Sequence, residues 1–155
     1  IDATRENCVT ASSADIPLAD ESIMSCIFDP PFLTYVKSAR QHNSIMAKRF
    51  GGYWRYDELQ EHYTQTAKEA YRVLGGKGLF VVKCQDIIHN HKLHPTHINM
   101  VNWARPMFRL KDLFVLPVKS RMPMPVKAGE AERRQKHARI FHSYFLVFEK
   151  LRASA

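Results

Sequence analysis

Four consecutive residues, Asp29-Pro30-Pro31-Phe32, have the chemistry to hold a planar amino group. They follow a short apolar run, Ser25-Cys26-Ile27-Phe28, which predicts a buried strand that ends at the acid. Ligands bind at the carboxyl ends of strands in open α/β sheets. The prolines fix φ and carry no N–H, so the carbonyl groups of a stiff turn face outward as acceptors. Asp29 adds a carboxylate acceptor and Phe32 a flat face for a base; a turn cap and a core aromatic are the structural alternatives.

The chain has the length and composition of one soluble globular domain. Of its 155 residues, 45% are apolar and 25% are charged. It has no run of about eighteen apolar residues, which excludes a membrane-spanning helix, and no signal-peptide pattern. Because it does not begin with Met, we expect a processed or excised part of a longer protein. Three widely spaced cysteines, Cys8, Cys26 and Cys84, predict reduced core thiols in an intracellular protein.

The formal net charge of +8 is concentrated in two segments that we predict to be loops. Residues 37–55 hold five basic and no acidic side chains, and residues 119–139 carry a net charge of +5. Basic loops beside one site favour a polyanion, most simply nucleic acid, although a generally basic surface is the alternative. Trp54 would stack on a base or anchor its loop. The predicted nucleic-acid contacts are Lys37, Arg40, Lys48, Arg49, Trp54, Arg55, Lys119, Arg121, Arg133, Arg134 and Lys136.

Apolar spacing predicts two helices and five strands in one α/β domain. The clearest helix covers 57–74, with Asp57 as its N-cap and Gly75-Gly76 as its C-terminal cap. A second helix covers 96–104, with Thr96 as a possible cap. The first strand–helix–strand unit is parallel and right-handed, whereas the last two strands can form an antiparallel hairpin at the sheet edge. The predicted strands are 7–10, 23–28, 78–84, 108–116 and 140–149.

Two further groups of polar residues follow the strand at 78–84. Lys83, Gln85 and Asp86 share the predicted rim with Asp29, where they either line a cleft or end the strand. Four histidines, which lie within nine residues, could bind a transition metal or belong to a polar loop. No Cys-x-x-Cys pair accompanies them, so we favour the loop and predict no metal site. These histidines are His89, His91, His94 and His97.

The chain resembles the carboxyl-terminal half of class I S-adenosylmethionine-dependent methyltransferases. More narrowly, it is similar to the amino-methyltransferases that act on exocyclic NH2 groups, the N6-adenine and N4-cytosine DNA methyltransferases. Their motif of Asp, Asn or Ser, then Pro-Pro and an aromatic residue matches Asp29 to Phe32. The approach from Ile16 to Ser25, the helix end and strand from Arg72 to Val82, and the last strand from His142 to Lys150 are also similar.

The resemblance implies a Rossmann-like sheet, mostly parallel with an antiparallel edge hairpin. It implies methyl transfer from S-adenosylmethionine to an exocyclic amino group, with DNA favoured over RNA and adenine N6 favoured as the target. The implied catalytic residues are Asp29, Pro30, Pro31 and Phe32, and the implied cofactor contacts are Asp15, Ile16 and Asp29.

One departure from the family is that no glycine-rich turn lies between a first strand and a helix, the place where the cofactor's methionine part binds. The missing half is expected upstream in a longer parent, on another chain, or downstream if the motif order is permuted. We therefore expect residues 1–155 to be a single target-base domain of a longer methyltransferase, and the sequence leaves open whether this part is active alone. A non-catalytic nucleic-acid-binding remnant, an RNA-base methyltransferase and a protein-lysine methyltransferase remain the alternatives.

Overall fold

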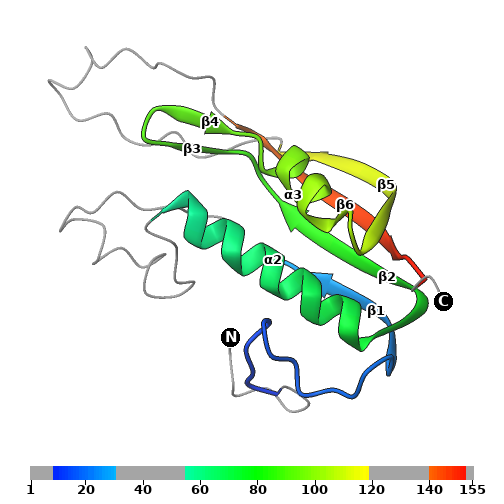
Figure 1. Cartoon of the computed structure of the whole chain (residues 1–155). Coiled ribbons are helices and arrows are strands. Elements are labelled where there is room, and N and C mark those ends of the chain that lie inside the picture. The colour runs from blue at the N-terminus through cyan, green and yellow to red at the C-terminus, as the bar shows by residue number, and fades with distance from the viewer. Residues whose placement is uncertain (1–8, 31–54, 119–139, 153–155) are drawn as a thin grey trace, which may run out of the picture.

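The computed structural model describes residues 9–30, 55–118 and 140–152. Two helices pack on one face of a four-stranded sheet, and a small hairpin projects beyond it (Figure 1). In chain order the elements are β1 (Ile23–Phe28), α2 (Tyr56–Val73), β2 (Leu74–Cys84), β3 (Ile87–His89), β4 (Lys92–His94), α3 (Thr96–Ala104), β5 (Phe108–Pro117) and β6 (His142–Lys150).

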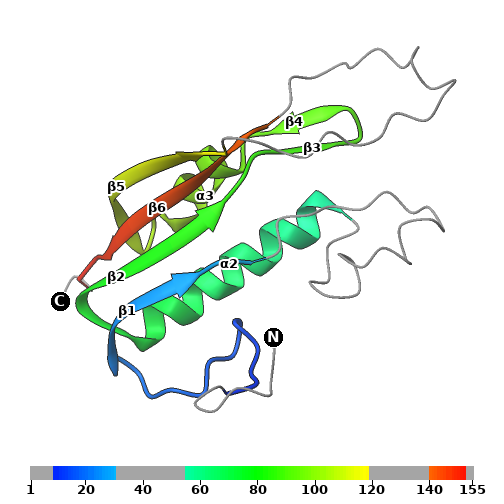
Figure 2. The ribbon, with the colours of Figure 1, turned by 180° about the vertical axis from the view of Figure 1, so that it is seen from behind.

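The strand order in the main sheet is β1-β2-β6-β5. The strands β1 and β2 are parallel, whereas β6 lies antiparallel to both β2 and β5. This arrangement confirms the predicted parallel β-α-β unit and the antiparallel final pair. Seen from behind, the strands lie in front of α2 and α3 (Figure 2). The carboxyl ends of β1 and β2 therefore meet at one edge of the sheet, where the Asp29 turn begins.

The core lies between the sheet and the two helices. One face of α2 is buried because Leu59, Tyr63, Ala67 and Ala70 recur at helical spacing. These side chains meet a layer of aromatic rings from the sheet. Phe80 is fully buried at its centre, with its ring centroid 6.4 Å from Phe28, 5.4 Å from Phe108 and 6.3 Å from Phe148.

The predicted glycine cap of α2 is wrong. The helix ends at Val73, and β2 begins at Leu74, which pairs with Ile23 of β1. The buried side chain of Leu74 and this pairing draw the chain straight into the strand. A side chain at Gly78 would bring its Cβ within 2.8 Å of the Gly75 oxygen. Close approach of the backbone explains the glycine at this position.

Both helix starts also differ from the prediction. The N-cap of α2 is Arg55, and Asp57 instead lies in the first turn, where a carboxylate favours the positive end of the helix dipole. The N-cap of α3 is Pro95, and Thr96 is the buried first residue of the helix. In each case the predicted capping residue lies just inside the helix, an error of one or two positions.

Two segments outside the main elements were predicted incorrectly. Val9 and Thr10 do not form a strand, and the rest of the predicted strand 7–10 lies outside the described residues. The predicted polar loop after β2 contains the hairpin β3–β4. Its two turn residues, Asn90 and His91, have φ of 50° and 60°, the left-handed pair that a tight two-residue hairpin requires.

Candidate functional site

Asp29 and Pro30 lie directly after β1, at the edge that the sequence predicted. Phe28 anchors this turn from below: it is buried, and its ring centroid lies 5.4 Å from that of Tyr63 in an edge contact. Pro30 is buried, whereas the Asp29 side chain is 51% exposed. The Asp29 carboxylate therefore faces solvent between two buried neighbours, Phe28 and Pro30. Pro31 and Phe32 lie outside the described residues.

The structure adds a partner that the sequence did not predict for Asp29. The Lys83 Nζ donates to Asp29 Oδ2 at 2.8 Å. The register explains this pair: Phe28 lies opposite Val82, so the next residue of each parallel strand stands side by side. Aligning the apolar run that ends before Asp29 with the run that ends before Lys83 would have predicted this ion pair. The ammonium group fixes one carboxylate oxygen and offsets its charge.

The two other polar residues at the end of β2 connect elements of the fold. Gln85 is buried and donates to the backbone oxygen of His142 at 2.6 Å. Asp86 Oδ1 lies 2.6 Å from His97 Nδ1, and the His97 ring stacks on Tyr144 with centroids 4.0 Å apart. Burial, the largest cause, raises the pKa of Tyr144. These contacts join β2 to α3 and β6, which favours the alternative that Gln85 and Asp86 end the strand.

The four histidines do not gather around one point. His97 pairs with Asp86, and the His94 ring stacks on Tyr56 with centroids 3.9 Å apart. Burial and the nearby Lys92 lower the pKa of His94. Within residues 9–30, 55–118 and 140–152, no three histidine, cysteine or acidic side chains are arranged to hold a metal ion.

Asp15 and Ile16, the predicted cofactor contacts, lie on a segment that α2 holds by polar contacts. The Ile16 amide donates to Glu69 Oε2 at 3.0 Å, and its carbonyl accepts from Arg72 at 2.8 Å. Arg72 also donates to the Leu18 carbonyl. The Asp15 amide closes a turn on the Ser12 carbonyl. The cofactor role of these two residues stays a prediction.

We predict that the contacts of Glu69 with Ile16 and Arg72 make the stability of the protein sensitive to acid. Hydrogen bonds from Arg72, the largest cause, and from Ile16 lower the pKa of Glu69 from 4.5 to about 2. Because the folded-state pKa is the lower one, this stabilisation is complete above pH 4.5 and is lost as the pH falls toward 2. Glu69→Gln should cost about 2 kcal/mol at pH 7, and in urea melts the difference should shrink below pH 4.5 and vanish only at about pH 2. An unchanged difference at low pH would contradict this role.

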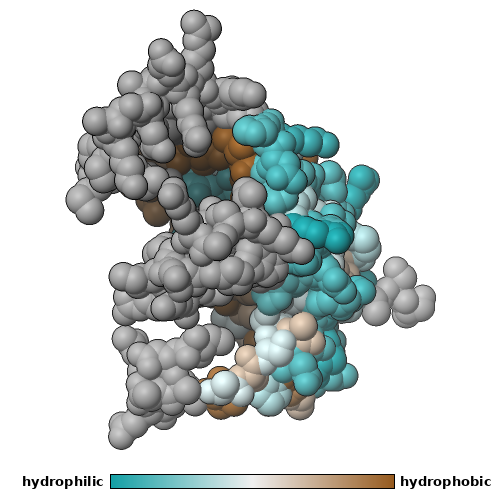
Figure 3. Space-filling view, turned by 90° about the vertical axis from the view of Figure 1, so that its left-hand side faces the viewer, coloured by the Kyte–Doolittle hydropathy of each residue, from teal (hydrophilic) through white to brown (hydrophobic). Residues whose placement is uncertain are grey.

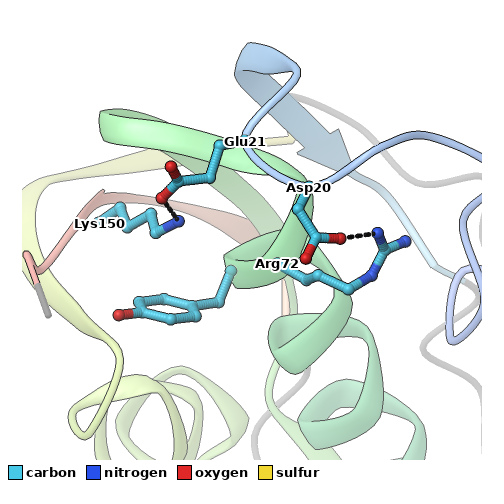
Figure 4. A pocket seen from close by; sticks show the side chains of 5 residues that line it. Asp20, Glu21, Arg72 and Lys150 are labelled. Atoms are coloured by element: carbon cyan, nitrogen blue, oxygen red, sulfur yellow. Dashed lines mark hydrogen bonds and ion pairs between the residues drawn. The ribbon is translucent and has the colours of Figure 1, made fainter.

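An open pocket lies at the end of the sheet away from Asp29, where β1 begins and α2 and β6 end (Figure 4). Its charged groups satisfy each other. Lys150, 7% exposed, donates to the Leu74 carbonyl at 2.6 Å and to Glu21 at 3.0 Å, and Arg72 pairs with Asp20 at 2.6 Å. We interpret these pairs as a fastening of the segment before β1 rather than as a ligand site.

The two basic segments are attached to the carboxyl edge of the parallel strands. Pro30 and Arg55, the described residues on either side of 31–54, follow β1 and precede α2. Val118 and Phe141 flank the second segment and are joined by a 2.7 Å backbone hydrogen bond. Hydrophilic and hydrophobic described residues are both visible in the space-filling view from this side (Figure 3). Arg55 forms an exposed ion pair with Asp57; the other predicted nucleic-acid contacts lie outside the described residues.

No family model and no curated protein matches the chain. Among solved structures, it is similar to a candidate DNA modification methylase from Thermus thermophilus in complex with S-adenosyl-L-methionine. The identity is 14% and the TM-score 0.58, over 93% of this chain and 55% of that one. It is also similar to the PvuII DNA methyltransferase, which is cytosine-N4-specific. The identity is 17% and the TM-score 0.58, over 86% of this chain and 44% of that one. For a methyltransferase from Methanosarcina mazei, the identity is 11% and the TM-score 0.51, over 91% of this chain and 65% of that one.

These similarities confirm the predicted fold class, a class I methyltransferase-like α/β sheet. The chain spans about half the length of the two DNA methyltransferase structures. Neither α2 nor α3 has the length and hydropathy of a membrane span among the described residues.

Proposed function

We propose that the chain is the target-binding part of a methyltransferase that modifies an exocyclic amino group of a nucleic-acid base, with DNA adenine N6 favoured. The position of Asp29 carries this proposal: it follows a parallel strand at the ligand-binding edge, and Lys83 fixes one of its oxygens. The fold is shared with a protein that was solved with S-adenosyl-L-methionine. The basic segments next to this edge suit a polyanionic substrate.

The chemical task of the site is to make a poor nucleophile attack. The lone pair of an exocyclic amine is delocalised into its base. We assign one N–H of the amine to Asp29 Oδ1 and the other to the Pro30 carbonyl, which turns the lone pair toward the donor. S-adenosylmethionine supplies the electrophilic methyl group. As the C–N bond forms, the C–S bond breaks, S-adenosylhomocysteine leaves, and the methylated nitrogen loses a proton to solvent.

Positioning supplies most of the acceleration in such an in-line displacement. The buried Phe28 and Pro30 and the ammonium of Lys83 hold the Asp29 carboxylate in place before the base arrives. The negative charge of Asp29 then stabilises the positive charge that develops on the nitrogen. We assign Phe32 to stacking on the target base, which must leave a duplex before it can reach the site.

We infer that the cofactor site needs more residues than our three candidate contacts. Asp15, Ile16 and Asp29 are our candidate contacts, and a glycine-rich turn must come from a further segment or subunit. Cytosine N4 is the second candidate target, because one similar structure is a cytosine-N4-specific enzyme.

A product assay tests the function. The full-length protein encoded by the reading frame is incubated with methyl-labelled S-adenosylmethionine and, in separate reactions, with unmethylated DNA, RNA or protein. The nucleic acids are digested to nucleosides and the protein to peptides for mass spectrometry. We expect N6-methyladenine; N4-methylcytosine would support the second target. Label in RNA or on lysine alone would replace the proposed substrate. No transfer together with retained DNA binding would identify a non-catalytic remnant.

The predicted DNA contacts have a separate test in the salt dependence of binding. Binding is measured as the logarithm of the DNA association constant against the logarithm of the salt concentration. Replacing Arg133, Arg134 and Lys136 with glutamine should make the negative slope shallower by about 2 to 3, since each phosphate contact contributes about 0.9. The matched control removes three exposed cations outside both basic segments, Lys68, Arg105 and Arg152. Equal slopes for the two triple variants would exclude residues 133–136 as contacts.

A further inference from the structure

The outer edge of β1 lacks the features that protect a sheet edge. Among the described strands, β1 and β5 are the two edges. Along β5, Arg109, Lys111 and Asp112 are exposed, its pairing with β6 is irregular after Leu110, and the strand ends at Pro117. Such charges, bulges and prolines prevent edge-to-edge association. The sequence of β1, Ile-Met-Ser-Cys-Ile-Phe, has no charge and no proline. By composition, β1 is an interior strand.

One row of side chains on the sheet face turned away from the helices is apolar across three strands. Ile27, Val81 and Val147 lie directly opposite one another on β1, β2 and β6, so their side chains share that face. Ile27 is 76% exposed. By contrast, the neighbouring row of Phe28, Val82 and Leu146 faces the helices and is buried. In Figure 2 no described helix or strand lies over this face of β1, β2 and β6.

All-parallel sheets occur almost only where both faces are covered, and β1 with β2 is the parallel part of this sheet. The DNA methyltransferase structures that share this fold are single chains about twice as long as the matched region. We propose that the β1 edge and the Ile27–Val81–Val147 row form a seam for another part of the same polypeptide. That part adds a strand parallel to β1 and covers the row with an apolar helix. The seam follows from the fold, whatever group the completed domain transfers.

Thiol labelling of the full-length protein tests the seam. Ile27→Cys and Ile98→Cys are made separately, with Cys8 and Cys26 replaced by serine and alanine. Cys84 stays silent because burial raises its pKa to about 12. Ile98 on α3 is 51% exposed and lies outside the seam, so it is the matched control. Relative to the same protein in urea, we expect the thiol introduced at position 27 to react at least about tenfold more slowly than the thiol introduced at position 98.

Other outcomes would overturn the proposal. Equal rates at positions 27 and 98 would mean that the face is open. Protection that disappears on dilution, with a change in sedimentation, would assign the surface to a second copy. A reading frame that encodes no further segment would exclude the proposed occupant.

Amide exchange on the unsubstituted protein gives an independent readout that needs no variant. A strand that is paired on both sides should show protection at consecutive β1 amides. If β1 is paired with β2 alone, only alternate β1 amides should be protected from exchange. That result would overturn the proposed added strand.

Discussion

Asp29→Ala is expected to lower the rate of methyl transfer by the full-length protein at least about a hundredfold. The substitution removes the carboxylate that we assign to the amine and that Lys83 holds at 2.8 Å. Folding should change little, because the side chain is 51% exposed and a surface ion pair contributes about 1 kcal/mol or less. DNA affinity should stay close to that of the unsubstituted protein, since we assign most of it to phosphate contacts in the two basic segments.

Three further variants separate the roles within this site. Asp29→Asn keeps an acceptor oxygen without the charge, so we expect activity between that of the alanine variant and that of the unsubstituted protein. Lys83→Gln should lower kcat by about tenfold, because it loosens the carboxylate without removing it. Asp112→Ala, an exposed acid on β5, is the control and should keep full activity. Normal turnover in Asp29→Ala would remove Asp29 from the catalytic role.

Apolar periodicity predicted the elements that position Asp29. The buried positions of α2 recur at three- and four-residue spacing, and the apolar run after Gly78 is typical of a buried parallel strand. These signals depend on local sequence, which is why β1, α2 and the core of β2 were predicted nearly to the residue. The turn at Asp29 followed from the end of the β1 run.

The errors arose where tertiary contacts override local preference. Gly75 and Gly76 look like a helix cap, yet pairing of Leu74 with β1 continues the chain as a strand. The hairpin after β2 depends on the left-handed backbone of Asn90 and His91, and this pair lacks the glycine of the usual Asn-Gly hairpin signal. Similarly, the Asp29–Lys83 pair depends on the register between two strands that lie far apart in the sequence. Its prediction needed the alignment of both apolar runs.

Phe80→Ala is expected to destabilise the full-length protein by about 4 kcal/mol. The ring is fully buried and is surrounded by Phe28, Phe108 and Phe148, so its removal leaves a cavity between the sheet and the helices. Equilibrium urea unfolding would measure the change. Phe141→Ala is the matched control: it removes the same side chain at a position that is 40% exposed, and it should cost less than about 1.5 kcal/mol.

The same substitution links the core to the proposed site. Phe28 lies between Phe80 and the Asp29 turn, so the cavity should loosen the turn in the molecules that remain folded. Measured well below its melting temperature, Phe80→Ala should therefore lose kcat beyond its unfolded fraction, while Phe141→Ala should not. A Phe80→Ala protein that is as active per folded molecule as the unsubstituted one would show that the turn is held by Pro30 and Lys83 without the aromatic layer. A cost below about 1.5 kcal/mol would mean that the surrounding rings close the cavity.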